Sequence, residues 1–401
     1  MIILVINAGS SSVKFTLFDM SDNKKVLANG LIERIGLEGT SVKYSNHKDY
    51  KYQDKVPVKN PQDAVKLVAK FLVGEESGVL KKLEEIDAIG HRVVHGMEKI
   101  QKPERITEQV KEAIKECFSV SPLHNPHNLA GVEACEAVLP GVPNVGVFDT
   151  AFHSTMPPRA YLYGLPYNLY AEDRIRRYGF HGTSHAYVSR AAAAFDGRPP
   201  QNLRIITCHL GNGASMAAVK GGICQDTSMG LTPLEGLLMG TRSGDLDPAI
   251  LLHLMKLKNL SVQDVDNLLN KQSGVLGLAG VGSSDLRDIE EAADKGDKKC
   301  AMALEAYAYR VRKYIGSYIA ALGGLDILVF TAGAGENSVT LRAAVLADLE
   351  EVGFKLDPAR NAVRSPEIRV ISADDSRYKV LVVPTNEELA IAEFTQEVLA
   401  S

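Results

Sequence analysis

The sequence predicts an α/β protein of two domains, or at most three, and three observations carry that prediction. Strand-like and helix-like patterns alternate along the chain, which is typical of an α/β architecture. At 401 residues the chain is too long to fold around one core. One design, a buried strand followed by a small polar turn and a second strand, occurs near residue 6 and again near residue 210. Such a repeat indicates a duplicated fold.

The first copy of this design is INAGSSSVKF, residues 6–15. The run before it has the pattern of a strand buried on both faces. After it, Val13, Phe15 and Leu17 alternate with other residues like a half-buried strand. Asn, Gly and Ser are turn residues, so a hairpin is the simplest interpretation. A loop that holds a ligand is the alternative, and this segment alone does not decide between the two.

The rest of the first half adds helices and strands. Apolar residues recur at helical spacing over residues 63–73 and 107–118, and Thr107 is a suitable N-cap for the second helix. The segment DAIGHRVVHG is predicted as a strand that ends in a Gly turn. A further strand is predicted for NVGVFDTAFH, residues 144–153, with Asp149 near its carboxyl end.

The second half repeats the opening design in residues 204–228, RIITCHLGNGASMAAVKGGICQDTS. A third Gly-rich turn follows a third buried strand over residues 326–338, and a helix is predicted over residues 339–351. The longest helical pattern covers residues 301–322. The final segment NEELAIAEFTQEVLA is also helical, with Asn386 near its start.

Composition argues against several classes of function. The net charge of −4, without a basic stripe, argues against a nucleic-acid partner. No segment has the length of a membrane span, and the N-terminus lacks the features of a signal peptide, so no membrane partner is expected. The five cysteines are scattered and form no CxxC motif, which is typical of a reducing cytoplasm. We therefore expect a cytoplasmic protein.

Paired histidines in HRVVH, HNPH and HGTSH raise the question of a metal site. HRVVH lies in a predicted strand, where residues four apart share a face but stand about 13 Å apart. The sequence contains no HExxH motif and no Cys–His cluster of ligand spacing. We therefore predict no zinc site, and expect hydrogen-bonding roles around the site or in the core for His91, His95, His124, His127 and His185.

Three small-residue turns after three buried strands indicate backbone N–H groups that converge on an anion. Lys14 lies just beyond the first turn, where its ammonium could reach a phosphate. None of the turns is a P-loop, and no GxGxxG motif follows a strand. Each turn is weak evidence by itself. Two similar turns in duplicated halves and a third before a helix together favour a nucleotide in a cleft between domains.

Specific motifs extend from residue 7 to residue 389, and on these residues the sequence resembles the acetate kinases. The resemblance covers essentially the whole chain and includes NAGSSSVKF, GHRVVHG, SPLHNPHN, VFDTAFHSTMP, YGFHGTSH, HLGNGAS, DTSMGLTPLEGLLMGTRSGDLDP, TAGAGENS and PTNEEL. It implies the superfamily of sugar kinases, heat-shock chaperone ATPases and actin. One departure is Ala334, where a bulky aliphatic residue is more usual, and this puts the fine shape of the adenine pocket in doubt.

The resemblance implies a duplicated ribonuclease H-like βββαβαβα core in two domains, with the active site in the cleft between them. Prolines make the chain irregular after residue 150, where we place the boundary. Residues 1–150 are expected to form the N-terminal domain, completed by the C-terminal helix at 385–401. Residues 151–384 are expected to form a C-terminal nucleotide-binding domain. Hinge closure about the cleft and a homodimer are implied by the resemblance as well.

The implied reaction is reversible phosphoryl transfer from ATP to acetate, giving ADP and acetyl phosphate. A carboxylate with a pKa of about 4 is already ionised at neutral pH, so the nucleophile needs no general base. Positioning and electrostatics dominate such chemistry. Acetate and ATP are the expected small-molecule partners, and Mg²⁺ the expected cofactor, with Mn²⁺ able to substitute.

Two arginines are the strongest catalytic candidates, because guanidinium forks hold carboxylate or phosphoryl oxygens. On local sequence alone, Arg92 could be a structural ion pair and Arg242 an exposed loop charge. The resemblance assigns Arg92 to acetate, and Arg242 together with His181 to the transition state. Asp149 is expected to orient Mg²⁺ through water or to hold an arginine.

The remaining site residues follow from the resemblance. For Mg²⁺ they are Asn7 and Glu387, although Glu387 alone would be an ordinary acid in the first turn of a helix. The acyl pocket is expected to contain Val94, Leu123, Phe180 and Pro233, each of which could also be plain core. The nucleotide residues are expected to be Ser10, Ser12, Lys14, His209, Leu210, Gly211, Asn212, Gly213, Asp285, Leu286, Arg287, Gly333, Ala334, Gly335, Glu336 and Asn337.

Two alternatives to an acetate kinase remain open from the sequence. A propionate or butyrate kinase would share the mechanism, because one methylene changes binding by only about 1–3 kcal/mol. A nucleotide switch like actin or the chaperones would share the phosphate turns. Such a switch would not need Arg92, His181 and Arg242 around an acyl pocket, and little chain is left for a partner-binding domain.

Overall fold

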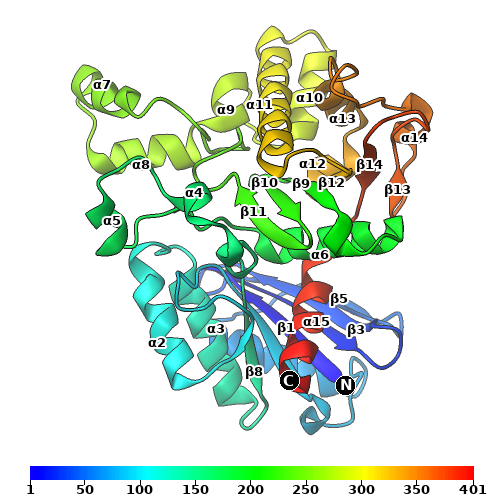
Figure 1. Cartoon of the computed structure of the whole chain (residues 1–401). Helices are drawn as coiled ribbons and strands as arrows, with labels where there is room; N and C mark the ends of the chain where they lie inside the picture. Colours follow the sequence, from blue (N-terminus) through cyan, green and yellow to red (C-terminus); the bar gives the residue numbers. More distant parts are fainter. The chain divides into compact units, whose positions relative to one another are not determined.

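The computed structural model describes residues 1–401, which form two compact units. Unit 1 consists of Met1–Phe152 together with Asn386–Ser401, and unit 2 of His153–Thr385. Each unit contains one β-sheet with helices on its faces (Figure 1). None of the helices combines the length and the apolar character that a membrane-spanning segment requires.

The sheet of unit 1 has eight strands in the order β5-β4-β3-β2-β1-β6-β8-β7. Strand β1 (Ile2–Ala8) is antiparallel to β2 (Ser12–Asp19) and parallel to β6 (Ala88–Val93). Strand β8 (Asn144–Phe148) is parallel to β6. Strands β1, β6 and β8 therefore end at one edge of the sheet, where α/β folds place functional residues. The remaining strands are β3 (Lys25–Glu33), β4 (Ser41–Asn46), β5 (Lys51–Lys55) and β7 (Glu104–Arg105).

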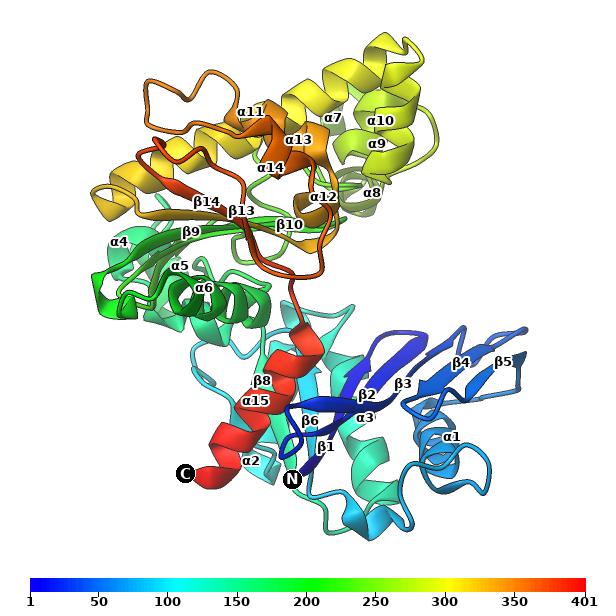
Figure 2. The ribbon, with the colours of Figure 1, turned by 90° about the vertical axis from the view of Figure 1, so that its right-hand side faces the viewer.

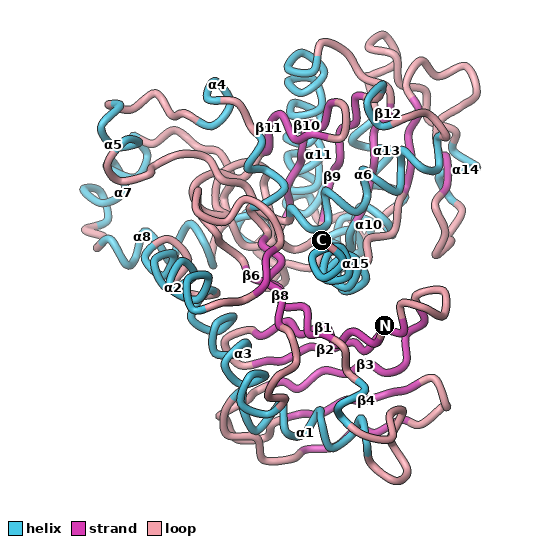
Figure 3. The backbone as a smooth tube through the Cα atoms, turned by 60° about the horizontal axis from the view of Figure 1, so that its bottom comes forward, coloured by secondary structure: helices cyan, strands magenta, loops and turns pink.

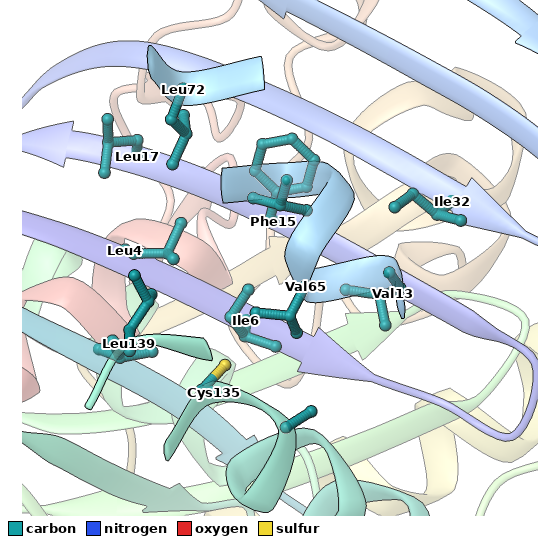
Figure 4. Packing of buried hydrophobic residues seen from close by; sticks show 14 of the residues in the cluster. Leu4, Ile6, Val13, Phe15, Leu17, Ile32, Val65, Leu72, Cys135 and Leu139 are labelled. Atoms are coloured by element: carbon teal, nitrogen blue, oxygen red, sulfur yellow. The ribbon is translucent and has the colours of Figure 1, made fainter. Parts of the chain in front are cut away.

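Helices α1 (Pro61–Val73) and α3 (Asn125–Val138) pack on one face of this sheet and lie side by side (Figure 3). Alternate residues of β1 point to this face, since strand side chains alternate between faces. Figure 4 shows Leu4 and Ile6 of β1 among the apolar side chains of this core, with Phe15, Leu17, Val65, Leu72, Cys135 and Leu139. Burying each large apolar side chain stabilises the fold by about 1.5–3 kcal/mol.

The opposite face of the sheet is covered by α15 (Glu387–Ala400), the last helix of the chain. The intervening residues of β1, Ile3 and Val5, pack there with Ile391 and Ala392 of the helix. Strand β1 is therefore buried on both faces, which explains its continuous apolar run.

The sheet of unit 2 has six strands in the order β11-β10-β9-β12-β14-β13. Helix α6 (Gly182–Asp196) covers one face, and α11 (Lys298–Leu322) the other (Figure 2). The strands are β9 (Arg204–Leu210), β10 (Ala214–Lys220), β11 (Ile223–Thr227), β12 (Ile327–Thr331), β13 (Arg369–Val370) and β14 (Lys379–Val382). The α-helices between β11 and α11 are α7 (Ala249–Lys258), α8 (Val262–Lys271), α9 (Gly274–Ala279) and α10 (Leu286–Asp294).

The two sheets share one connectivity. In each, three antiparallel strands follow one another in sequence, and two further strands pair in parallel on the other side of the first: β3-β2-β1-β6-β8 and β11-β10-β9-β12-β14. This is the strand order of a ribonuclease H-like core, present twice. The predicted duplication and fold class are confirmed.

Helix caps agree with the sequence signals. The hydroxyl of Thr107 accepts from the backbone N–H of Val110 at the start of α2 (Glu108–Glu116), as predicted. Asn386 caps α15 by accepting from the N–H of Leu389. Each such cap contributes about 1 kcal/mol. The remaining short helices are α4 (Pro158–Tyr161), α5 (Tyr167–Ala171), α12 (Ala332–Asn337), α13 (Val339–Leu346) and α14 (Pro358–Ala362), with 3₁₀ turns at Leu83–Glu85, Cys117–Ser119, Ala151–Thr155 and Pro200–Asn202.

Two predicted elements are shorter in the structure. The strand predicted over residues 144–153 ends at Phe148, because Asp149 turns its side chain to an arginine and a 3₁₀ turn follows. The helix predicted over residues 339–351 ends at Leu346, although the apolar period continues. The backbone leaves the helical region at Ala347, whose ψ is 143°, and Asp348 follows with a φ of 59°, in the left-handed region.

The third Gly-rich turn, predicted within residues 326–338, is instead the short helix α12. It begins directly after β12 at Ala332, which has a φ of 63°. The carboxylate of Glu336 accepts from the backbone N–H of Ala332 at 2.8 Å and so closes this turn from within. A side chain that satisfies the orphan N–H of the first helical residue lets the chain enter a helix without a loop.

Candidate active site

The pair Arg92–Asp149 lies where the parallel strands of unit 1 end. Arg92 is near the end of β6, and Asp149 directly follows β8. Nη2 of Arg92 donates to Oδ2 of Asp149 at 2.7 Å, and its Nε lies 3.2 Å from both carboxylate oxygens. The arginine side chain is 24% exposed and the aspartate 2%. This fork geometry fixes the guanidinium while leaving part of it accessible.

Charge and burial shift the pKa values of this pair. The Asp149 carboxylate raises the pKa of Arg92 above its ordinary value. Burial raises the pKa of Asp149, and the charge of Arg92 limits that rise. Glu387 raises the pKa of both groups, so its carboxylate is close enough to act on them electrostatically.

Helix α15 contributes a second set of charges to this end of unit 1. Its first two residues are Glu387 and Glu388. The ammonium of Lys14, on β2, forms an ion pair with Glu388. Asn7 of β1 lies opposite Lys14 in the β1–β2 register. The amide of Asn7 and the carboxylate of Glu387 supply the hard oxygen donors that Mg²⁺ prefers, so this donor set fits the metal.

The segment that connects Asn7 to Lys14 is a hairpin, as the sequence predicts. Strands β1 and β2 pair as far as Ala8 and Val13, and the N–H of Gly9 donates to the carbonyl of Ser12 at 2.8 Å. Ser10, at its tip, is exposed. The hairpin therefore presents small residues and a free hydroxyl at the same sheet edge as Arg92.

In unit 2, His181 stands immediately before α6 in a left-handed conformation, with φ 57° and ψ 23°. Such a conformation is uncommon for a residue with a Cβ and is characteristic of functional sites. Its ring stacks on that of His209, with centroids 4.3 Å apart and planes 16° apart. Nδ1 of His181 and the hydroxyl of Ser215 are 2.8 Å apart, which leaves Nε2 on the other side of the ring.

A buried network fixes both rings. Ser215 also lies 2.8 Å from Nε2 of His185, and Ser184 lies 2.8 Å from Nδ1 of His209. Burial holds the pKa of His185 well below its ordinary value, so this histidine is neutral at pH 7. A neutral ring can accept on one nitrogen and donate on the other, which links hydroxyl to hydroxyl across the core.

The guanidinium of Arg242 lies close to His181, next to Gly213 in the turn between β9 and β10. A Cβ placed on Gly213 would be 3.4 Å from Nη1 of Arg242 and 3.5 Å from Nε2 of His181. The two candidate groups therefore flank one small space at Gly213. Nη1 of Arg242 donates to the carbonyl of Pro233 at 3.1 Å, and burial lowers the pKa of this arginine. No carboxylate pairs with it.

The loop that carries Pro233 and Arg242 is held by a second arginine. Nη1 of Arg177 reaches three successive carbonyls, of Thr227, Ser228 and Met229, at 2.9–3.2 Å. Its Nη2 donates to Glu235 at 2.6 Å. This arrangement fixes the start of the loop, so the position of Arg242 does not depend on its own side-chain contacts alone.

A cavity of about 690 Å³ opens in unit 2 next to the β9–β10 turn. Three segments that are distant in sequence, and that were predicted to bind the nucleotide, line this cavity. The predicted residues that line it are Gly211, Asn212, Asp285, Leu286, Arg287, Gly333, Ala334 and Asn337. Its volume lies within the range of small-molecule sites, about 300–1,000 Å³.

Five other residues of unit 2 that were predicted for the nucleotide do not line this cavity: His209, Leu210, Gly213, Gly335 and Glu336. The Leu210 side chain is fully buried in the sheet. Gly335 is buried in α12. The carboxylate of Glu336 accepts from the N–H groups of Ala332 and of Thr385 at 2.8 and 2.9 Å, so it holds the segment in place. Ser10, Ser12 and Lys14 belong to unit 1.

Five lining residues were missed by the sequence reasoning: Gly240, Ser284, Glu290, Ser338 and Arg364. Glu290 follows Leu286 by one helical turn of α10, so helical periodicity could have found it. Gly240 lies in the quoted motif that contains Arg242. A Cβ there would meet Oδ1 of Asn212 at 1.8 Å, so a larger residue would displace the Asn212 side chain. No sequence signal points to Arg364.

The residues predicted for the acyl pocket divide between the units. In unit 1, Val94 is buried, whereas Leu123 is 66% exposed. In unit 2, Phe180 is buried, and its carbonyl lies 2.9 Å from Nε2 of His153. Pro233 is tied to Arg242. Each unit thus supplies an apolar residue next to a candidate arginine or histidine.

The family model, the similar sequences and the similar structures all point to the same protein family. Residues 2–393 match the family model described as the acetokinase family. An acetate kinase from Clostridioides difficile is 55% identical over 98% of this chain and 98% of its own length. The crystal structure of Porphyromonas gingivalis acetate kinase superposes with a TM-score of 0.95, at 47% identity and 99% coverage of both chains. A propionate kinase from Francisella tularensis superposes with a TM-score of 0.91, at 41% identity and 99% coverage of both.

Proposed function

The chain belongs to the acetokinase family and is a phosphotransferase with acetate as its acceptor, and we propose that it transfers the γ-phosphoryl group of ATP directly to acetate, in line. The acceptor carboxylate is ionised at neutral pH, so no residue has to remove a proton. The task of the protein is to bring an anion onto a polyanion and to stabilise the charge of the transferring group.

Arg92 binds the acetate carboxylate in this proposal. Asp149 holds the guanidinium on one side through three short contacts, and the remaining donors stay available. Val94, two residues further along the chain, provides an apolar contact for the methyl group. Asp149 acts by fixing Arg92, and its burial in that pair argues against a role as a base.

The nucleotide occupies the cavity of unit 2, and Arg242 with His181 stabilises the transferring phosphoryl group. The observation that carries this proposal is the space at Gly213, flanked by Nη1 of Arg242 and by Nε2 of His181. Both atoms can donate, and Arg242 has no carboxylate partner that would neutralise it. Donors arranged before the reaction stabilise developing charge without reorganisation.

Magnesium is the proposed cofactor, held by Asn7 and Glu387, and Mn²⁺ is expected to substitute for it. Mg²⁺ keeps most of its waters and needs few protein ligands, so two side chains suffice. When bound, the metal neutralises charge on the phosphates. The protein's own contribution is to hold Asn7 at the end of β1 and Glu387 at the start of α15.

The experiment is steady-state ADP production with Mg·ATP and acetate, propionate or butyrate, with hydroxylamine to trap the acyl phosphate. Acyl hydroxamate that depends on acetate, with lower kcat/KM for the longer acids, supports the proposal. The matched variants are Arg92→Leu and Arg105→Leu, the second an exposed arginine at the edge strand β7. ADP release without hydroxamate from any acid would contradict the proposal and favour a nucleotide switch.

Propionate is the second candidate acceptor, and the similarity to the Francisella tularensis propionate kinase favours it. The mechanism would be unchanged, because one methylene alters only the apolar end of the acceptor. Equal or higher kcat/KM with propionate in the same assay would select this alternative.

A homodimer is proposed from the surface of α7. This helix, AILLHLMKLK, has no buried residue, and Ile250, Leu252 and Leu257 are 44–63% exposed. Exposed apolar patches of this kind mark protein interfaces. Leu252→Glu with Leu257→Glu is expected to produce a monomer in analytical ultracentrifugation, with Lys256→Glu as the control.

A cytoplasmic location is proposed from the five unpaired, buried cysteines.

A further inference from the structure

The motif SPLHNPHN, residues 121–128, contains the predicted pocket residue Leu123, and it begins helix α3 with two buried amides that have no role in the proposed reaction. Asn125 is 0% exposed and Asn128 4%. Buried amides are rare unless every hydrogen bond is satisfied, so their partners show what they do.

Asn128 joins the ends of two neighbouring strands. Its Nδ2 donates to the carbonyl of Ala8, the last residue of β1, at 2.8 Å. Its Oδ1 accepts from the N–H of Val94, just beyond β6, at 3.0 Å. A carbonyl only accepts and a backbone N–H only donates, so the two partners fix the orientation of the amide.

This bridge lies where the backbone pairing stops. The β1–β6 register ends at Ile6 and His91, whereas β1 continues to Ala8 and β6 to Val93, with Val94 directly after it. Neighbouring strands twist relative to one another, so their unpaired ends diverge unless something connects them. The side chain of Asn128 makes that connection.

The helix also approaches Ala8 closely. One turn after Asn128, a Cβ placed on Gly131 would lie 2.5 Å from the Cβ of Ala8. Only glycine allows this approach, which brings the amide of Asn128 within reach of the carbonyl. Two independent features of α3 therefore serve the same contact with the end of β1.

The two strand ends carry different parts of the proposed site. Ala8 lies between Asn7, the proposed metal ligand, and the hairpin that holds Ser10 and Ser12. Val94 lies two residues after Arg92, the proposed acetate ligand. The Asn128 bridge therefore sets the distance between Asn7 with its hairpin, which are proposed to face the metal and the phosphates, and Arg92, which is proposed to bind the acceptor.

Asn125 provides an internal comparison. It lies on the same helix and is equally buried, and its amide bonds the N–H and carbonyl of His95 and the carbonyl of Ile114. None of these partners belongs to β1. Asn125 therefore holds the segment after β6 without connecting it to the hairpin.

We propose that Asn128 is a positioning residue that fixes the hairpin of β1 and β2 relative to Arg92 and Val94, an inference that rests on the proposed function. It touches no reacting atom. Because a misplacement of about 1 Å can cost about 100-fold in rate, a side chain that sets this distance is expected to affect nucleotide use rather than folding alone.

The test compares Asn128→Asp with Asn125→Asp. In Asn128→Asp, the ionised carboxylate still accepts from the N–H of Val94 but repels the carbonyl of Ala8. At pH 8, the KM for Mg·ATP is expected to rise about 10-fold and kcat to fall about 10-fold, with the KM for acetate within about threefold. Asn125→Asp is expected to leave the KM for Mg·ATP within about twofold.

The pH dependence separates positioning from plain destabilisation. Burial raises the pKa of the introduced carboxyl, and its protonated form donates to Ala8 again. The ratio of variant to wild-type kcat should therefore rise as the pH falls from 8 to 6. If Asn128→Asp does not fold, Asn128→Ser, which adds no buried charge, carries the same comparison of Michaelis constants.

Equal Michaelis constants for Mg·ATP in the two variants, or a kcat ratio that does not change with pH, would overturn the role of Asn128. The wild-type protein, assayed in parallel, reports separately on the proposed function. Acetate-dependent hydroxamate from the wild type together with equal constants in both variants removes only the role of Asn128, whereas its absence removes both proposals.

Discussion

Arg92 in unit 1 and Arg242 in unit 2 are both half-buried arginines, and their surroundings show two ways of holding a cation. Arg92 is paired with Asp149, which raises its pKa. Arg242 donates to the carbonyl of Pro233 and lies 3.8 Å from the sulfur of Met239, and burial lowers its pKa. The first charge is balanced inside the protein, whereas the second is left for a ligand to balance.

The difference fits the proposed roles. A ground-state ligand such as acetate needs a guanidinium held in one orientation, and a carboxylate partner supplies that. A transition state gains charge as the phosphoryl group transfers, so a cation without an internal partner stabilises it more. Substitutions that remove the Arg242 charge or the carboxylate partner of Arg92 should therefore affect activity and stability differently.

The largest effect is expected for Arg242→Met. Loss of an arginine that contacts a transferring phosphoryl group costs about 10³–10⁵ in kcat. The free energy of unfolding should stay unchanged or increase, because the variant removes a buried charge that has no carboxylate partner. Urea unfolding and steady-state kinetics on the same preparation test both statements. More than a tenth of the wild-type kcat would show that this charge is not used.

Asp149→Asn is expected to have the opposite profile in stability. It breaks the pair and leaves Arg92 in a protein environment without its carboxylate, which costs about 3 kcal/mol in the free energy of unfolding. The KM for acetate should rise as Arg92 loses its fixed orientation. Unfolding in urea and an acetate titration measure the two effects. An unchanged unfolding free energy would contradict the structural role of the pair.

The two units are also expected to respond differently to acid. Burial lowers the pKa of His91 in unit 1 and of His153 in unit 2 to about 4, and that of His185 in unit 2 well below its ordinary value. Below a pH of about 6.5 the unfolded chain binds protons that these buried rings do not. Stability is therefore full above pH 6.5 and is lost as the pH falls toward 4, by about 3 kcal/mol for a shift of this size.

Urea unfolding between pH 7 and 4.5 tests this statement. His91→Gln and His153→Gln should each reduce the slope of unfolding free energy against pH by a similar amount, with exposed His253→Gln as the control. A slope that none of the buried substitutions changes would assign the acid sensitivity to other groups.

Much of this architecture could be predicted from the sequence, because local patterns determine it. The buried strands, the caps at Thr107 and Asn386, and the duplicated hairpin all follow from residue periods and turn chemistry. Tertiary contacts decided the rest. The α12 helix depends on Glu336 turning back to Ala332, and α13 ends at Leu346 despite a continuing apolar period. Both override the local signal.

The candidate site was less accessible to sequence reasoning. Motifs identified Arg92, Asp149, His181 and Arg242 as important, but not which arginine has a carboxylate partner, since that depends on strand register. Arg364 could not be predicted for a similar reason, because its place in the cavity depends on how distant segments pack together.

Gly213 adjoins both Arg242 and His181, so a substitution there tests whether the space between these two groups is used. In Gly213→Ala the new methyl group would meet Arg242 and His181 at 3.4 and 3.5 Å, an ordinary contact distance, so the fold accepts it. The methyl group occupies the space where the phosphoryl group is proposed to lie, and a displacement of that kind should lower kcat about 10- to 100-fold at unchanged stability. Gly316→Ala in α11 is the control, because nothing lies within 4 Å of its Cβ. It should retain activity and gain about 1 kcal/mol. Wild-type kinetics in Gly213→Ala would show that the transferring phosphoryl group does not lie beside Arg242 and His181.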